Sequence, residues 1–77
     1  MLKEMVEYLA RALVDNPNAV SVEAVEGEKT TTLKLKVAAP DLGRVIGKQG
    51  RTARAMRTLL HAAAARSRRR AVLEILE

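Results

Sequence analysis

The first stretch of the chain has a helical pattern, because apolar residues recur at spacings of three and four between residues 2 and 15. That spacing places apolar side chains in one stripe along a helix, which we expect to pack into the core. The segment Asp15-Asn16-Pro17-Asn18 should end the helix, since proline cannot continue it and restricts the residue before it. The stripe consists of Leu2, Met5, Val6, Leu9, Leu13 and Val14.

Two later stretches, residues 19–26 and 31–38, alternate between apolar and polar side chains. This alternation is typical of a β-strand with one buried face. The short turn over residues 26–29 predicts that the two strands form an antiparallel hairpin. Lys34 and Lys36 lie on the polar side of the second strand, which we interpret as a solvated sheet face. The expected inner faces consist of Val20, Val22 and Ala24, and of Leu33, Leu35 and Val37.

The second half of the chain predicts two helices separated by a glycine turn. Pro40 stops the strand, and Asp41 is a suitable N-cap for a short helix that ends near Ile46. A longer helix is expected over residues 51–66. At 100° per residue this helix has an apolar flank and a basic flank that begins at the glycine turn. The apolar flank consists of Ala53, Met56, Leu59, Leu60 and Ala63, and the basic flank of Arg51, Arg54 and Arg57, with His61 near them.

A basic segment, Ser67-Arg68-Arg69-Arg70, leads to a final strand over residues 71–76, in which Leu73 and Ile75 face inward. A strand that returns to the same sheet after two helices should be parallel and reached by a right-handed crossover. The expected order is therefore α-β-β-α-α-β. We predict an α+β fold with a three-stranded mixed sheet and three helices on one face, formed by residues 1–77 as a single domain.

The net charge of +5 is concentrated in one half of the chain. Residues 1–40 hold five Lys/Arg against six Asp/Glu, whereas residues 41–77 hold nine against three. The basic half also contains the glycine turn. A concentrated positive field of this kind favours a polyanionic partner, although charge alone is equally compatible with a solvated surface.

Several functional classes find no support in the composition. The chain has no cysteine, so it has neither disulfides nor thiolate metal ligands. His61 is the only histidine and the acids are scattered, so we expect no enzyme, no metal and no cofactor. No apolar run approaches the roughly 20 residues of a membrane span. Residues 1–5 lack a signal-peptide core, so we expect a cytoplasmic protein without membrane contact.

The segment Arg44-Val45-Ile46-Gly47-Lys48-Gln49-Gly50-Arg51 carries the strongest chemical signal. Glycine tolerates positive φ and allows another backbone to come close. A Gly-x-x-Gly turn before a helix can therefore present backbone N–H groups, together with the positive end of the helix dipole, to a phosphate. Lys48 and Arg51 add full charges at the same place. The Gly-x4-Gly-Lys-Ser/Thr spacing of a nucleotide-binding P-loop is missing.

The run Val45-Ile46-Gly47-Lys48-Gln49-Gly50 resembles the signature loop of the KH domain, an RNA-binding module that clamps four nucleotides by their backbone. The longer run from Gly43 to Leu60 is similar to the small bacterial single-KH proteins called KhpA, and the resemblance covers nearly all of the chain. It implies the type II KH arrangement and a narrow apolar groove beside the loop. Val45 and Ile46, with Val37 or its neighbours, are the expected lining, and core packing is the alternative for one of the first two.

We therefore predict a protein that binds single-stranded RNA. The resemblance implies an RNA chaperone or post-transcriptional regulator that affects cell growth and envelope processes. Two alternatives stay open: a protein-interaction adaptor in which RNA contact is secondary, and a binder of single-stranded DNA. Because Tyr8 is the only aromatic residue, we expect weak, salt-dependent binding with little sequence preference. The candidate RNA-binding residues are Arg44, Val45, Ile46, Gly47, Lys48, Gln49, Gly50, Arg51, Arg54 and Arg57.

The resemblance also implies a protein partner, either a second copy of the chain in a homodimer or a larger KH-containing protein in a heterodimer. Linking two weak sites raises avidity without new contacts. The candidate contact residues are apolar positions that the pattern leaves over, although core packing or scattered surface positions explain them equally well. They are Val25, Val72 and Leu76 on the open sheet face, and Leu59 and Leu60 on the long helix.

Overall fold

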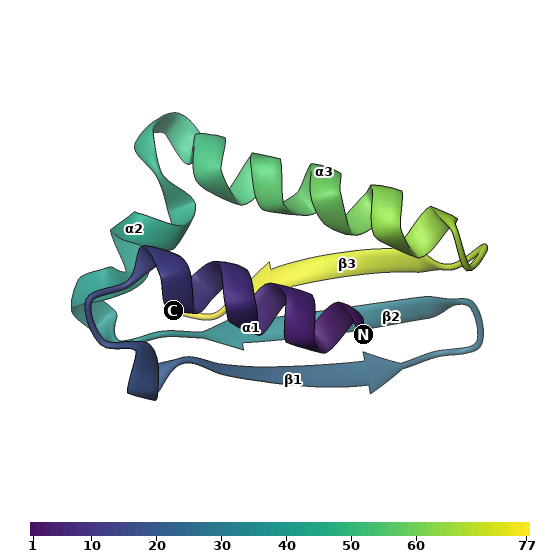
Figure 1. Cartoon of the computed structure of the whole chain (residues 1–77), viewed down its shortest axis with the longest axis horizontal. Coiled ribbons are helices and arrows are strands. Elements are labelled where there is room, and N and C mark those ends of the chain that lie inside the picture. Colours follow the sequence, from purple (N-terminus) through teal and green to yellow (C-terminus); the bar gives the residue numbers. More distant parts are fainter.

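The computed structural model describes residues 1–77 and contains the predicted helices and strands in the predicted order (Figure 1). Three helices lie on one face of a three-stranded sheet, which confirms the α+β fold and the type II KH arrangement. Short 3-10 helices occupy Pro17–Ala19, Ala39–Asp41 and Lys48–Gly50. The main elements are α1 (Leu2–Leu13), β1 (Ser21–Glu26), β2 (Thr30–Lys36), α2 (Leu42–Ile46), α3 (Arg51–Ala65) and β3 (Arg70–Ile75).

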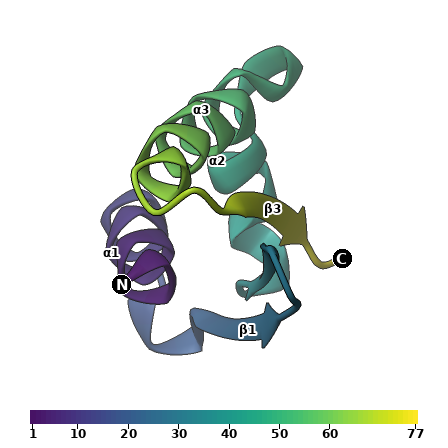
Figure 2. The same ribbon diagram turned by 90° about the vertical axis from the view of Figure 1, so that its right-hand side faces the viewer.

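The central strand of the sheet is β2, with β1 antiparallel on one side and β3 parallel on the other. Leu33 of β2 lies opposite Ala24 of β1 and Leu73 of β3. The predicted hairpin and the predicted parallel return are both confirmed. β3 is therefore an edge strand, and α3 packs along it, while α1 packs against β1 and β2 (Figure 2).

The core lies between the sheet and the helices and draws on every helix and strand. Leu33 and Leu35 of the central strand are fully buried, as their alternation with polar residues predicted. Burying one such side chain contributes about 1.5–3 kcal/mol. None of the helices combines the length and the apolar composition that crossing a membrane requires. The core cluster consists of Val6, Ala10, Val20, Val22, Leu33, Leu35, Val37, Val45, Met56, Leu60, Ala64, Ala71 and Leu73.

The buried face of α3 differs from the predicted one at Leu59. Leu59 is 49% exposed, whereas Leu60 and Ala64 are buried. A helix turns by 100° per residue, so a stripe that includes Leu60 and Ala64, four residues apart, leaves Leu59 to one side. The prediction that Leu59 packs into the core is therefore wrong, and Leu60 is not available as an exposed contact residue.

Asp41 does not cap α2 as predicted, because its carboxylate accepts hydrogen bonds from a distant segment. Its side chain makes no capping hydrogen bond to α2, and the residue is 3% exposed. The two carboxylate oxygens lie 3.2 Å from the backbone nitrogen of Asp15 and 3.1 Å from that of Asn16. Asp41 therefore fastens the end of α1 to the start of α2, which leads into the glycine loop.

We expect Asp41→Ala to lower the free energy of unfolding by about 2–3 kcal/mol. The change leaves two backbone N–H groups without their acceptor, and each such loss typically costs about 1–3 kcal/mol. Thermal unfolding followed by circular dichroism should show a Tm lower by about 8–24 °C in a domain of this size. Asp15→Ala is the matched control, because the Asp15 side chain is 77% exposed and a surface ion pair contributes about 1 kcal/mol at most. Equal Tm values for the two variants would contradict the role given to Asp41.

Candidate nucleic-acid interface

The loop of residues 47–50 joins α2 to α3 and has an unusual backbone. Gly47 has φ 78° and ψ 170°, a combination that only glycine adopts readily. Gly50 has φ 74° and ψ 14°, and Gln49 also has a positive φ of 57°. Positive φ at three of four positions reverses the chain sharply between the two helices. The loop therefore projects beyond the N-terminal end of α3 (Figure 1).

The loop uses some of its own backbone N–H groups internally. The amide of Gly47 donates to the carbonyl oxygen of Gly43 at 2.8 Å, and the amide of Gly50 donates to that of Gly47 at 3.1 Å. The amides of Lys48 and Gln49 take no part in the turn, loop or side-chain hydrogen bonds of the chain. Lys48 and Gln49 are also the first two residues of the 3-10 helix Lys48–Gly50, where N–H groups have no acceptor within the helix. These two adjacent N–H groups, rather than the whole row of amides, are therefore available to a ligand.

The two glycines are required for different reasons. A Cβ on Gly47 would lie 2.7 Å from the Cβ and 2.8 Å from the backbone nitrogen of Thr52, and would collide with the Thr52 hydroxyl. A Cβ on Gly50 would meet nothing within 4 Å. The expected reason for Gly47, room for an approaching nucleic acid strand, is therefore wrong, because the first turn of α3 fills that space. Gly50 remains open on its outer side.

Three cationic side chains lie at the N-terminal end of α3, beside the loop. Lys48, Arg51 and Arg54 are exposed, and none of them forms an ion pair. The Arg51 guanidinium donates to the Gln49 side-chain oxygen at 3.2 Å, which holds both side chains over the loop. Unpaired charges beside free amides and a helix N-terminus produce a local positive potential that suits a phosphate.

Arg44, a predicted RNA-binding residue, is engaged within the chain. Its guanidinium lies 2.9 Å from the Asp15 carboxylate and 3.4 Å from the Asp41 carboxylate. The two acids compensate its charge, and the contacts direct the side chain toward the end of α1. Arg44 therefore belongs to the structural support of the loop rather than to its free cationic surface.

The apolar residues next to the loop lie mostly in the core. Val45 is fully buried and Val37 is 8% exposed, whereas Ile46 is half-buried. Of the predicted pair, Val45 is thus the core member. Val45 therefore does not line a surface groove, and that part of the predicted lining is wrong, whereas Val37 lines a small pocket of about 170 Å³ together with Leu42 and Leu76.

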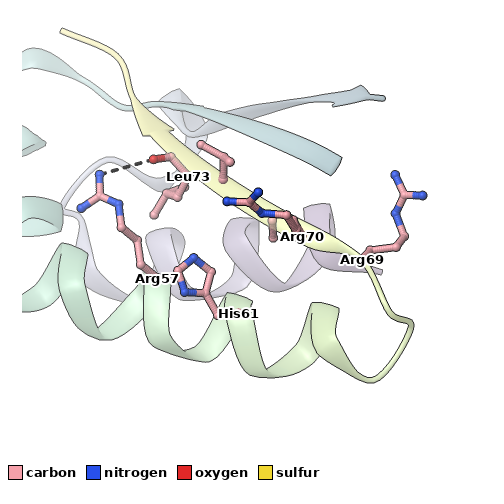
Figure 3. Close-up of a pocket in the computed structure, with 7 residues that line it drawn as sticks. Arg57, His61, Arg69, Arg70 and Leu73 are labelled. Atoms are coloured by element: carbon pink, nitrogen blue, oxygen red, sulfur yellow. Dashed lines mark hydrogen bonds between the residues drawn. The ribbon is translucent and has the colours of Figure 1, made fainter. Parts of the chain in front are cut away.

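A groove does exist, between α3 and the edge strand β3, with a cavity volume of about 400 Å³ (Figure 3). Arg57 and His61 of α3 face it from one side, and Figure 3 shows Arg70 over it from β3. The Arg57 guanidinium donates to the carbonyl oxygen of Leu73 at 3.3 Å, which fixes Arg57 across the groove. The remaining lining residues are Arg69, Ala71, Val72 and Leu73.

Arg70 and Val72 were absent from the predicted site, although the sequence placed both correctly in or beside the last strand. The missing step was spatial: β3 lies at the sheet edge and α3 runs along it, so this edge meets the basic flank of the helix. A parallel return after the basic helix was the signal that could have located them. The loop, the free flank of α3 and the groove together form one cationic surface that extends along α3, about 22 Å for its 15 residues.

The fold and this loop define the class of protein. A Gly-x-x-Gly loop between two helices, followed by a parallel return to the edge of a three-stranded sheet, is the architecture of a type II KH domain. A family model described as "KhpA/KhpB, KH domain" matches residues 3–75. The chain belongs to the KhpA/KhpB KH-domain family.

Curated relatives match over almost the whole chain. The RNA-binding protein KhpA of Aquifex aeolicus is 54% identical over 76 residues, which cover 99% of this chain and 96% of the relative. The RNA-binding protein KhpA of Treponema pallidum is 52% identical over 77 residues, which cover 100% and 96%. That of Caldanaerobacter subterraneus subsp. tengcongensis is 51% identical over 73 residues, which cover 95% and 97%.

Proposed function

We propose that this chain binds single-stranded RNA through the loop of residues 47–50 and the groove between α3 and β3. The observation that carries the proposal is the pair of free amides at Lys48 and Gln49, placed between unpaired cationic side chains at the start of α3. KH domains clamp a short stretch of RNA by its backbone, and the curated relatives are named as RNA-binding proteins.

In the proposed complex the loop holds the sugar-phosphate backbone. The N–H groups of Lys48 and Gln49 donate to a phosphate, and the open side of Gly50 lets the strand come close. Lys48, Arg51 and Arg54 neutralise the phosphates that follow. Single-strand geometry is required because a rigid duplex cannot place its bases in a groove at a sheet edge while its backbone contacts the loop.

The bases would lie in the groove, over Val72 and Leu73. No Phe, Tyr or Trp lines it, so His61 and the arginine guanidinium planes are the only side chains there that can stack on a base, a contact that contributes about 1–3 kcal/mol per base where large aromatic rings supply it. Phosphate contacts then supply most of the affinity, and binding discriminates little between sequences. Such a domain suits a cytoplasmic RNA chaperone or post-transcriptional regulator with many transcripts as targets. Residues 1–77 act as one KH domain without catalytic function in this proposal.

A salt titration with Arg54→Gln tests the phosphate contacts. For single strands, log K falls with log salt with a slope of about 0.7 per neutralised phosphate. We expect Arg54→Gln to reduce this slope by about 0.7 and to weaken binding of a uridine oligonucleotide about fivefold at 0.1 M salt, measured by fluorescence anisotropy.

Arg11→Gln is the matched control for that titration, because it removes the same charge from α1, away from the loop and the groove. Its slope should stay within experimental error of the parent protein. Identical slopes for Arg54→Gln and the parent would show that this flank of α3 contacts no phosphate.

A second candidate function is that of a protein-interaction adaptor that forms a homodimer or pairs with a larger KH-containing protein. Exposed apolar side chains favour it: Val25 is 44%, Val72 43% and Leu76 39% exposed, and Leu59 on α3 is 49% exposed. Leu60 is buried and drops out of this set. An adaptor needs no free amides in the loop, so a loop variant that loses RNA but keeps its oligomeric state in sedimentation would separate the two functions.

A further inference from the structure

The C-terminal end of α3 contains an arginine in a position that usually belongs to glycine. Arg68 has a φ of 57°. The amide of Arg69 donates to the carbonyl oxygen of Ala64, and that of Arg68 to the carbonyl oxygen of Ala65, both at 3.0 Å. This pair of bonds is a Schellman motif, whose left-handed residue is most often glycine because a Cβ is strained there. Residues other than glycine that are held in such a strained backbone conformation concentrate at functional sites.

Arg69 fastens the same segment to the opposite hairpin. Its guanidinium donates to the Glu26 carboxylate at 2.9 Å, to the Thr31 hydroxyl at 3.1 Å and to the carbonyl oxygen of Gly27 at 3.2 Å. Thr31 is 3% exposed and itself donates to Glu26 at 2.8 Å. The segment of residues 66–69, here called the connector, is therefore held rigidly against the β1–β2 turn.

The remaining arginines of this end are left without acidic partners. Glu26 is already paired with Arg69, and Arg66, Arg68 and Arg70 form no ion pair or side-chain hydrogen bond. Arg70 lies over the groove (Figure 3), whereas Arg69 lines the end of the groove and its guanidinium extends to the hairpin. The connector thus ends the groove with fixed backbone and free positive charge, one helix length from the loop (Figure 1).

We propose that the connector is a second phosphate-binding site, with Arg68 as its ligand-contacting residue and Arg69 as a positioning residue. This inference rests on the proposed function and extends it. RNA strands long enough to leave the groove at the far end contact Arg68, whereas strands of about four nucleotides fill only the loop and the groove. Glycine at this position would give a more stable helix end. Arg68 instead places a cationic side chain there, in spite of its left-handed conformation.

The test is Arg68→Gly, measured with uridine oligonucleotides of about four and about twelve nucleotides. We expect affinity for the longer strand to fall about fivefold at 0.1 M salt, as loss of one phosphate contact implies. Affinity for the short strand, measured by NMR titration, should change less than twofold. The Tm should rise by about 2–5 °C, because glycine removes the strain at this position.

Two further variants complete the test. Arg68→Lys keeps the charge and the strained backbone, so it should retain the affinity and the Tm of the parent. Arg68→Asn tolerates the left-handed conformation without a charge, and should repeat the loss seen with glycine. Unchanged affinity of Arg68→Gly and Arg68→Asn for the longer strand overturns the proposal, and so does an equal loss for both strand lengths. Loss of short-strand binding in loop variants would still support the proposed function, so the two ideas fail separately.

Discussion

Replacing Lys48 and Gln49 together by Asp is expected to weaken binding of single-stranded RNA by at least about 100-fold. The change removes one positive charge, adds two negative ones, and places both carboxylates beside the free amides that we assign to a phosphate. Each lost phosphate contact alone costs about fivefold at 0.1 M salt, and repulsion of the strand adds to that loss. Fluorescence anisotropy with a uridine oligonucleotide measures the effect.

The fold should survive this double substitution, because both side chains are exposed and neither belongs to the core cluster. Circular dichroism provides the folding control. Lys3→Asp with Tyr8→Asp is the matched variant: it changes the net charge by the same amount at exposed positions of α1. The affinity of that variant for RNA should fall only by the small amount that the change in net charge causes. RNA affinity unchanged in a folded loop variant would remove the basis of the proposed function.

Gly47→Ala is expected to destabilise the fold by about 3 kcal/mol or more, in contrast to Gly50→Ala. The added methyl group at position 47 collides with Thr52 at the first turn of α3, and the backbone there lies in a region accessible almost only to glycine. To relieve the collision, the loop or the start of α3 must move. Thermal unfolding should show a Tm at least about 12 °C below that of the parent.

Gly50→Ala provides the comparison, because its methyl group would meet no atom within 4 Å and only the φ of 74° is unfavourable. We expect a loss of about 1 kcal/mol, equivalent to a Tm decrease of about 4–8 °C. Expressed as free energies, the loss of RNA affinity should exceed the loss of stability. The reason is that the methyl group projects from the open side of the loop, which the RNA strand approaches in the proposed complex. Similar Tm values for the two variants would contradict the different roles of the glycines.

The glycine loop illustrates how far residue patterns reach in this protein. The sequence predicted a Gly-x-x-Gly turn with cations beside it, and the structure contains that turn between the expected helices. It did not distinguish the two glycines, because the reason for Gly47 is contact with Thr52, five residues away, in a geometry that depends on how α3 begins. The availability of the Lys48 and Gln49 amides likewise depends on which carbonyl groups the folded loop brings within reach.

The charged residues likewise show what local sequence predicts and what only the folded structure reveals. Arg44 and Arg54 look equivalent along the chain, yet the fold pairs Arg44 with two carboxylates and leaves Arg54 unpaired. Asp41 looked like a helix cap and instead accepts bonds from the end of α1. Asp15 and Asn16 lie 25 or more residues from Arg44 and Asp41 along the chain, so these contacts cannot be inferred from local spacing.

What the sequence determined by itself was the set of elements, their order and the parallel return of the last strand to the sheet. Those features follow from local causes, namely the period of apolar residues, the restrictions of proline and glycine, and the geometry of right-handed crossovers. Only the tertiary structure decided that Leu59 stays exposed on α3, which cations stay free, and that the groove opens at the edge strand β3. These outcomes depend on contacts between distant segments, whose energies come from packing and hydrogen bonding in three dimensions.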